Sequence, residues 1–411
     1  MKSLIRTLLL TTLVVLPLLA PPTANAARKM EVAVQDDGVF IFDDPFITMD
    51  RDSALRFSRF LGVTHIRMNI LWWQAVPMSQ RNQTTVPSNI VYDFRVWDDA
   101  VARAAAYGLK SQITLAGDPP AWACGNKKVP YECDGYKPNV KLWKGFVKAA
   151  VAHFKGRVKR YSLWNEPSWY TWLSPHKKSP LLYRKLAMTG YKAAHRADDN
   201  AEVVIGELTP QLRKGLSIPP LRFIREMVCV NKRLERTRRA NRKCGRRPLK
   251  FDAFAHHPYD FEHKPTYEQE NRDEVTMANI DDLRKLLDKL RKKGLIKPKK
   301  KKFPIYLTEY GYMVADNPQV LKSRRIKERK RKKWIVQGWR MAQEAKRVKQ
   351  QMHYNLISPQ PGSPSGYFDL GLIDANGTPR PSYTALRNYL VAAAADGKVA
   401  KPRPCAGGTS C

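Results

Sequence analysis

Residues 142–166 read LWKGFVKAAVAHFKGRVKRYSLWNE, in which a helical stretch over 142–154 leads into a β-rich run over 159–166. The same alternation continues in both directions along the chain. The β-rich runs are 31–35, 65–72, 110–116, 159–166, 203–208, 251–259, 304–310 and 353–358. The helical stretches are 93–107, 142–154, 182–196, 279–292, 333–349 and 383–394. Alternation of this kind predicts an α/β fold in which helices join parallel strands.

Eight β-rich runs are the number that closes a (β/α)8 TIM barrel. We therefore predict a single barrel domain over residues 27–395, a size that α/β barrels reach as one domain. The alternative is an open doubly wound sheet, which usually carries a Gly-rich turn after its first strand, and no such turn follows 31–35. A hydrophobic content of 43% excludes wholesale disorder.

The first 26 residues have the layout of a secretory signal peptide. Lys2 and Arg6 form a basic start, residues 8–20 are an apolar run, and Ala24-Asn25-Ala26 is a small-residue cleavage site. The run is too short for a transmembrane helix, so no membrane span is expected. The alternative is a buried N-terminal helix. We expect a secreted, extracellular protein that starts near Ala27 and ends in a short tail over 396–411.

Secretion permits disulfides, and the six cysteines fall into three close pairs. Six cysteines allow 15 pairings in principle. Local pairing, in which each bridge closes one loop, is the simplest expectation: Cys124–Cys133, Cys229–Cys244 and Cys405–Cys411. Metal binding is the alternative, but the cysteines lack a C-x-x-C spacing or a nearby series of histidines, so no metal site is predicted.

Two of the predicted strands end in a glutamate. The fourth ends in LWNEP at 163–167 and the seventh in LTEYG at 307–311. In a barrel the carboxyl ends of the strands carry the chemistry, and a buried carboxylate is costly unless it is paired or used. A pair of carboxyl groups, one protonated and one ionised, can cleave a glycosidic bond. The alternative is that each forms a structural salt bridge.

These motifs resemble those of clan A glycoside hydrolases, which are retaining (β/α)8 enzymes. The resemblance rests on WNEP at 164–167, TEYG at 308–311, HIRMNILW at 65–72 and HHPY at 256–259, and it covers roughly residues 30–395. The chain looks nearest to secreted, cellulase-like actinobacterial proteins of family 5 or a family 39-like group. The resemblance implies a glycosidase that hydrolyses O-glycosidic bonds of a β-linked polysaccharide or oligosaccharide by double displacement.

The resemblance also assigns roles to residues. Glu166 would be the general acid/base, Glu309 the nucleophile, and Asn165 a ligand of the sugar 2-hydroxyl. Arg67 would keep Glu309 ionised, because a nearby cation lowers the pKa of a carboxyl group. Adjacent residues on a regular strand face opposite ways, so Asn165 and Glu166 can both reach the sugar only if the strand end bulges or twists.

Further residues are expected around the sugar, although each has an alternative role in packing. Tyr259 or Tyr310 would donate a hydrogen bond to the nucleophile, and His257 would contact Glu166 or a sugar hydroxyl. Clan members often have a Trp on the eighth strand, where this chain offers only Tyr354. Other candidate sugar platforms are Trp72, Trp73, Trp122, Trp169 and Trp172. Asp118 and Glu207 also follow strands but belong to no motif, so we expect structural or subsite roles.

The chain has 73 Lys and Arg against 37 Asp and Glu, a net charge of +36. Most of the excess lies in residues 232–250, 289–302 and 322–333. The first two precede strands and should lie away from the active end of the barrel, whereas the third follows a strand and can approach substrate. We interpret the first two as a docking surface for an anionic envelope or matrix polymer. The alternative is that such runs are simply solvated surface.

Two other functions compete with a glycosidase. One is a non-catalytic carbohydrate- or cell-wall-binding barrel, which would have no need of both glutamates. The other is a nucleic-acid binder, which would need aromatic residues among the basic runs to stack on bases. Residues 289–302 contain none, so no nucleic-acid partner is predicted. No cofactor is expected, because two carboxyl groups suffice for the reaction.

Overall fold

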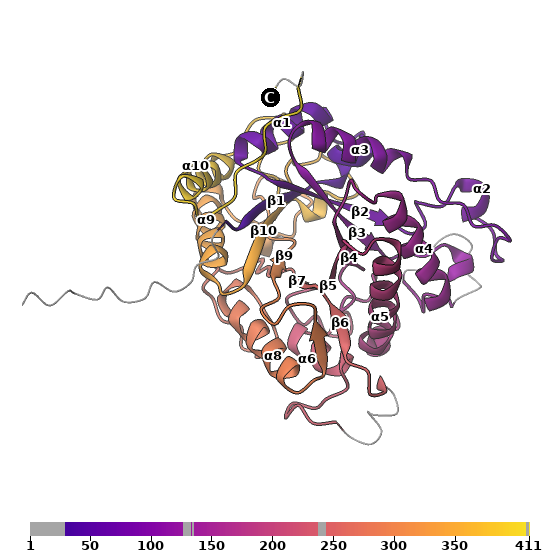
Figure 1. The fold of residues 1–411 in the computed structure, drawn as a ribbon. Coiled ribbons are helices and arrows are strands. Elements are labelled where there is room, and N and C mark those ends of the chain that lie inside the picture. The colour runs from indigo at the N-terminus through magenta and orange to yellow at the C-terminus, as the bar shows by residue number, and fades with distance from the viewer. Residues whose placement is uncertain (1–28, 126–132, 134, 237–243, 408–410) are drawn as a thin grey trace, which may run out of the picture.

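The computed structural model describes residues 29–125, 133, 135–236, 244–407 and 411 (Figure 1). It has a closed barrel of parallel strands in the order β1-β10-β9-β7-β5-β4-β3-β2, with helices around it. The predicted (β/α)8 TIM barrel is therefore confirmed. The barrel strands are β1 (Glu31–Gln35), β2 (His65–Leu71), β3 (Lys110–Ala116), β4 (Arg160–Leu163), β5 (Glu202–Leu208), β7 (Ala253–His256), β9 (Ile305–Leu307) and β10 (Val348–Tyr354).

The predicted signal peptide, residues 1–26, lies outside the described residues. Within the part of the chain that the structure describes, no helix combines the length and the apolar character needed to cross a bilayer.

The eighth strand begins earlier than predicted, at Val348 instead of residue 353, and it ends at Tyr354. The missed part contains Gln350 and Gln351, which are fully buried. Inside the barrel Gln350 Nε2 donates to Gln112 Oε1 at 2.8 Å. The apolar pattern did not predict this part of the strand, because its buried side chains carry amide groups.

The predicted run 251–259 is divided in the structure. Only Ala253–His256 (β7) belongs to the barrel, whereas β6 (Leu249–Phe251) pairs with β8 (Ile296–Pro298) in a separate parallel two-stranded sheet. In this small sheet Lys250 lies directly opposite Lys297. Two of the basic runs are thus brought side by side before β7 and β9 begin.

The predicted helices are present, with shifted ends, as α3 (Arg95–Ala106), α4 (Val140–His153), α5 (Ser179–Ala197), α8 (Ile280–Lys292), α9 (Glu328–Glu344) and α10 (Pro381–Ala395). Among the described residues, three α-helices were not predicted: α1 (Arg51–Leu61), α2 (Met78–Arg81) and α6 (Pro220–Met227). The sequence contained features that predict helix α1. Asp50 caps the helix by accepting a hydrogen bond from Ser53 N, and the buried residues follow the helical spacing.

Two of the three predicted disulfides are confirmed, Cys229–Cys244 and Cys405–Cys411, with Cα atoms 6.1 and 6.6 Å apart. The predicted Cys124–Cys133 bridge stays a prediction, and the two residues lie close together in this structure. Their side chains interact with each other, and each sulfur also approaches a backbone carbonyl. Cys124 Sγ lies 3.4 Å from the oxygen of Ala121, and Cys133 Sγ lies 3.5 Å from that of Pro119.

The C-terminal tail is held against the end of the barrel where the strands begin. Ala400 N donates to Met30 O at 2.9 Å, and Ala406 N donates to Ala106 O at 2.9 Å. The backbone of Gly108, with φ of +68°, passes so close to Arg403 O that a side chain there would overlap it. These contacts leave the carboxyl ends of the strands to form the functional site.

Candidate active site

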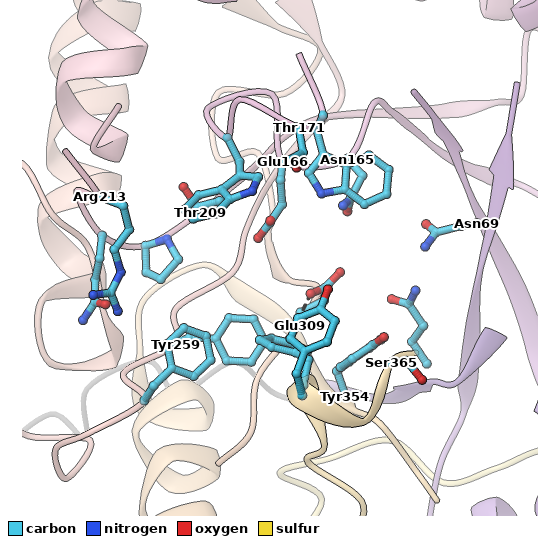
Figure 2. Close-up of a pocket in the computed structure, with 18 of the residues that line it drawn as sticks. Asn69, Asn165, Glu166, Thr171, Thr209, Arg213, Tyr259, Glu309, Tyr354 and Ser365 are labelled. Carbon is cyan, nitrogen blue, oxygen red and sulfur yellow. Dashed lines mark hydrogen bonds between the residues drawn. The ribbon is translucent and has the colours of Figure 1, made fainter. Parts of the chain in front are cut away.

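The two predicted carboxylates meet at the carboxyl end of the barrel. Glu166 follows β4 and Glu309 follows β9. One oxygen of each lies within 4.8 Å of the other and of a ring nitrogen of His257. Figure 2 shows both side chains in a pocket of about 470 Å³. This spacing fits the separation of about 5–5.5 Å found between carboxyl groups in retaining glycosidases and is too short for the roughly 6.5–9.5 Å of inverting ones.

The backbone after β4 allows two neighbouring residues to face the same pocket. Trp164 has φ of +77° and Glu166 has φ of +36°, so the chain leaves the extended conformation on both sides of Asn165. The Trp164 ring is buried, and its Nε1 donates to Trp172 O at 2.8 Å. Asn165 and Glu166 both line the pocket, as the predicted departure from a regular strand requires.

Arg67 is the centre of a buried hydrogen-bond network in the barrel. Its side chain is fully buried and donates from Nη1 to Glu309 Oε1 at 2.8 Å, which confirms the predicted contact. Nη2 donates to Glu207 Oε2 at 2.6 Å and to Asn165 Oδ1 at 2.8 Å. Burial lowers the pKa of Arg67, but the charges of Glu207 and Glu309 raise it by more, so the guanidinium stays charged.

Glu207 is a central residue of the site whose role the sequence did not reveal. Its side chain is completely buried, and it faces Arg67 because β5 is irregular between Gly206 and Leu208. Gly206 has φ of +112° and Glu207 has φ of +49°. A glycine inside a strand-like run often marks such a bulge, so VVIGEL at 203–208 held a signal that Glu207 faces inward.

The surroundings of Glu309 favour the ionised form of this carboxyl group more than the surroundings of Glu166 do for theirs. Burial raises the pKa of Glu309 to about 7, while Arg67 and the hydroxyl of Tyr259 act to lower it. Tyr259 Oη donates to Glu309 Oε2 at 3.1 Å. Tyr259 therefore has the predicted contact with the candidate nucleophile.

Glu166 has surroundings that favour the protonated form. Burial raises its pKa well above the usual value, and the negative charge of Glu309 raises it further. Its oxygen Oε1 lies 2.9 Å from Nδ1 of His257, one of the two contacts predicted for this histidine. Burial, together with Arg67, lowers the pKa of His257 well below its usual value, so this neighbour is neutral. Glu309 is thus the carboxyl that ionises first.

Tyr310 does not belong to the site, so its predicted alternative role is wrong. Its hydroxyl lies 3.4 Å from Trp334 O in α9. Gly338 of the same helix makes room for the ring, because a methyl group there would overlap the Tyr310 hydroxyl. Tyr310 follows Glu309 directly, and neighbouring residues at a strand end point to opposite sides of the barrel wall.

Trp72 is also not a sugar platform. It is fully buried, with its ring stacked on Phe146 at 5.5 Å between centroids. Trp122 packs against Trp72 at 6.4 Å, and Trp73 lies beneath the guanidinium of Arg81. The remaining two candidates, Trp169 and Trp172, line the pocket.

Tyr354 lies in the pocket as predicted, with its ring 5.7 Å from that of Phe368. Asp118 also lines the pocket. Several other lining residues were not predicted. Gln35 and Asn69 come from β1 and β2. Loops that are distant in sequence supply Arg213, Arg324, Tyr367 and Phe368.

Glu166, His257 and Glu309 are also the group whose spacing could admit a metal ion. Carboxylate oxygens and an imidazole nitrogen are suitable ligands for several divalent metals. The same three groups already have protein partners that suit proton transfer, namely His257 for Glu166 and Arg67 with Tyr259 for Glu309. Acid–base and nucleophilic chemistry by these carboxyl groups needs no metal.

Several solved structures of glycoside hydrolases share the barrel fold of this chain. A family 39 glycoside hydrolase from Bacteroides cellulosilyticus superposes with a TM-score of 0.60 and 16% identity over 90% of this chain, which spans 65% of that enzyme. A family 39 β-xylosidase from Caulobacter crescentus gives 0.58 and 16%, over 88% of this chain and 71% of the other. A family 5 broad-specificity endoglucanase from Clostridium acetobutylicum gives 0.54 and 10%, over 90% and 99%.

No protein-family sequence model matches the chain, and no curated protein matches it in sequence. The structural neighbours named above are clan A glycoside hydrolases of families 39 and 5. At sequence identities of 10–16%, their similarity to this chain establishes the shared barrel fold.

Because the pKa of Glu166 is raised, this residue lowers the free energy of unfolding by an amount that depends on pH. At about pH 4 the carboxyl is largely protonated in both folded and unfolded chains, and the cost is small. As the pH rises, only the unfolded chain loses the proton readily, so the cost grows. We expect Glu166→Gln to raise the unfolding free energy by about 1–2 kcal/mol at pH 7 and by much less at pH 4, measured by denaturant unfolding.

The matched control is Glu268→Gln, which removes an exposed carboxylate paired with Arg272. This change should alter the unfolding free energy by less than about 0.5 kcal/mol at either pH. A gain from Glu166→Gln that is equal at both pH values would contradict the raised pKa.

Proposed function

We propose that this protein is a retaining glycoside hydrolase that cleaves β-linked glycans by double displacement. The observation that carries the proposal is the pair Glu166 and Glu309, close together in one pocket and held in different environments. Only Glu309 is bonded to a buried cation. A carboxyl pair with different proton affinities is what this reaction requires. The fold that the chain shares with glycoside hydrolases adds support.

In the first step Glu166 donates its proton to the glycosidic oxygen while Glu309 attacks the anomeric carbon. The bond to the leaving group breaks, and a covalent glycosyl-enzyme ester forms on Glu309. In the second step the ionised Glu166 removes a proton from water, which attacks the same carbon and releases Glu309. Arg67 and Tyr259 hold the nucleophile in position throughout through bonds to its two oxygens.

Asn165 is suited to hold the sugar 2-hydroxyl. Its Oδ1 accepts a hydrogen bond from Arg67, which fixes the amide and leaves Nδ2 to act as a donor in the pocket. A hydrogen bond to this hydroxyl strengthens as positive charge develops on the sugar ring. The aromatic side chains of Trp169, Trp172 and Tyr354 line the pocket and can pack on the apolar faces of sugar rings.

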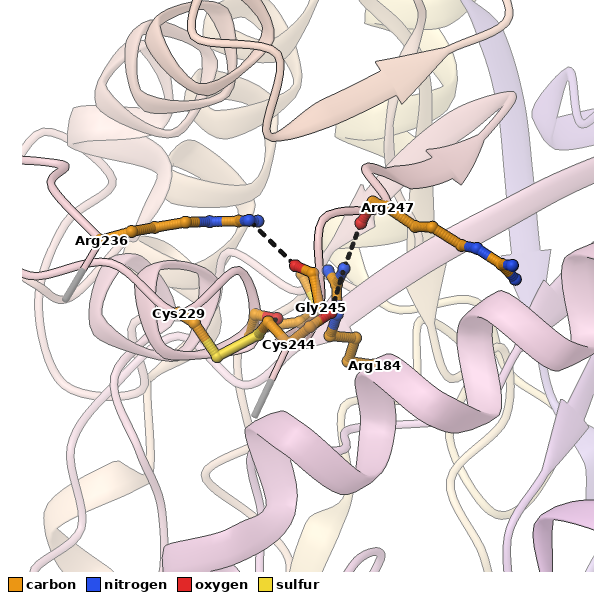
Figure 3. Close-up of a disulfide and its surroundings, with 7 residues drawn as sticks. Arg184, Cys229, Arg236, Cys244, Gly245 and Arg247 are labelled. Atoms are coloured by element: carbon orange, nitrogen blue, oxygen red, sulfur yellow. Dashed lines mark hydrogen bonds between the residues drawn. A yellow bond between two sulfur atoms is a disulfide. The ribbon is translucent and has the colours of Figure 1, made fainter. Parts of the chain in front are cut away.

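We also propose that the enzyme acts outside the cell and docks on an anionic polymer through a basic surface. We define this surface as residues 232–236, 244–250 and 289–302; residues 237–243 of the first run lie outside the described residues. The pairing of Lys250 with Lys297 in the β6–β8 sheet supports one continuous patch, and both side chains are exposed. In Figure 3 the Cys229–Cys244 disulfide ties α6 to the chain that leads into β6, and Arg184 donates to Arg247 O beside it.

The reaction can be tested with aryl β-glycosides and azide. Removal of the acid/base in Glu166→Ala should lower the rate by about 10²–10⁴-fold, and azide should restore turnover with retained configuration of the glycosyl azide. Glu309→Ala should lose turnover, and azide should then give a product of inverted configuration, identified by NMR. Full activity in both variants would reject the roles of Glu166 and Glu309. An absence of turnover by the wild type on every glycan in a broad panel would reject the enzyme in favour of a binding barrel.

Tyr259→Phe tests how the nucleophile is kept ionised. Glu309 must be deprotonated to attack, so activity falls as the pH drops through its pKa. The Tyr259 hydroxyl lowers that pKa. Its removal should therefore move the acidic limb of the kcat/KM profile to higher pH, by about one pH unit or less. The control is Tyr310→Phe, which alters the neighbouring tyrosine outside the pocket and should leave the limb in place. Equal kcat/KM profiles for the two variants would contradict this role of Tyr259.

Polyanion chromatography tests the docking surface. Replacement of Lys299, Lys300, Lys301 and Lys302 by Gln should lower the salt concentration needed to elute the protein from phosphocellulose. The matched control replaces Lys322, Lys327, Lys330 and Lys333, which are equally exposed and lie in the third basic run. It removes the same charge, so an equal loss of retention in both variants would show that net charge alone governs binding.

A further inference from the structure

Two arginines line the candidate active-site pocket, and the reaction proposed above uses neither. Arg213 comes from the loop between β5 and α6, and Arg324 ends a short helical turn at Lys322–Arg324 in the loop after β9. Figure 2 shows Arg213 at one end of the pocket and Asn69 at the other, with Glu166 and Glu309 between them. The arginines are therefore beside the reacting centre but outside the network around Arg67.

The guanidinium of Arg324 is largely enclosed and has little protein to bind. Its side chain is 24% exposed, and its Nε is buried without a hydrogen-bond partner. The only carboxylate within ion-pair distance among the described residues is Glu262, 4.0 Å away. The neighbouring Arg325 differs, since it donates to Val320 O at 2.8 Å and to Pro318 O at 2.6 Å. Arg325 serves the loop, whereas Arg324 faces the pocket.

Arg213 is similarly available. Its guanidinium donates no hydrogen bond to any acceptor in the part of the chain that the structure describes, although its backbone NH is bonded to Ser217. The nearby carboxylate of Glu274 already accepts hydrogen bonds from Leu212 N and Asn271 Nδ2. The charge of Arg213 is also felt by Arg324, because it adds to burial in lowering the pKa of that residue. Two cations that line one pocket favour an anion beside them, because the nearby carboxylates are either at the limit of ion-pair distance (Glu262) or already hydrogen-bonded (Glu274).

Aromatic rings connect this pair of arginines to the nucleophile. The Arg324 guanidinium lies 5.2 Å from the centre of the Phe261 ring. Phe261 stacks on Tyr259 at 4.9 Å, and Tyr259 donates to Glu309. Phe261 and Tyr259 both line the pocket. The rings of Phe261 and Tyr259 thus lie between the Arg324 guanidinium and Glu309, so Arg324 faces a part of the pocket beyond the sugar that is attacked.

We propose that Arg213 and Arg324 form a subsite for an acidic sugar, one that carries a carboxylate or a sulfate ester, next to the bond that is cleaved. This inference rests on the proposed glycosidase function and names the class of its substrate. Asn165 holds the sugar that is attacked, and in Figure 2 Arg213 lies on the far side of Glu166 from Asn165, so the acidic sugar is on the leaving-group side. Guanidinium groups bind oxyanions through paired hydrogen bonds, which neutral sugars cannot match.

The test measures binding to the Glu166→Gln protein, so that turnover plays no part. The ligands are β-linked oligosaccharides that contain a hexuronate, the same oligosaccharides after reduction of the carboxyl to a hydroxymethyl group, and sulfated analogues. We expect at least one acidic form to bind about 10–100-fold more tightly than its neutral counterpart by calorimetry, as hydrogen bonds to a charged group predict. This preference should weaken as salt is added. The uronate and sulfate arms identify which anion is recognised.

Variants locate the effect. Arg213→Gln and Arg324→Gln, added singly to the Glu166→Gln protein, should each reduce the preference, and together they should abolish it. Neither side chain donates a hydrogen bond within the described protein, and a thermal melt checks that both variants fold. Lys322→Gln is the matched control: it removes one exposed charge from the same turn and should keep the preference.

Equal binding of acidic and neutral forms, or a preference that survives in the double variant, would overturn the subsite. The same holds if no oligosaccharide binds. The glycosidase proposal has its own test in the azide experiment on neutral aryl glycosides. Turnover there with no acidic preference here would reject only the subsite.

Discussion

The site depends on one buried cation, the guanidinium of Arg67. A charged group inside a barrel is tolerated only where hydrogen bonds and opposite charges replace water. The barrel supplies these groups from successive strands or from the residues that follow them: Gln35, Thr114, Asn165, Glu207 and Glu309. A single side chain of β2 therefore fixes the positions of groups on five other strands, and the candidate catalytic residues are among them.

Arg67 also makes the two candidate catalytic carboxyl groups different. It bonds directly to Glu309 but not to Glu166, which has a neutral histidine as its neighbour. Both carboxyls are buried, so burial alone would raise the pKa of both in the same way. The difference between them comes from the placement of one cation and of the Tyr259 hydroxyl. Glu207 provides a second negative charge for Arg67, and its own charge raises the pKa of Glu309.

The sequence was informative where chemistry and strand order coincide. Glu166, Glu309, Arg67, His257 and Tyr259 each stand in a short motif at the end of a β-rich run, and the barrel brings all five together. The predictions were wrong for residues that differ from the site residues only in the side of the barrel wall that they face. Tyr310 and Trp72 are as close to the motifs as the true site residues, yet their rings face helices. Local sequence does not reveal which neighbour points inward once the strand has ended.

Arg213 and Arg324 could not have been found from a motif, because loops more than 100 residues apart bring them together. The basic runs of the chain lie at different ends of the barrel. Lys250 and Lys297, one from each of the first two runs, lie opposite each other in the β6–β8 sheet, before β7 and β9 begin, whereas Arg324 lines the pocket at the other end. Parallel strands separate these ends by the full height of the barrel. An anionic polymer bound at the basic surface would therefore not compete with the glycan segment in the pocket, and one long acidic glycan could occupy both.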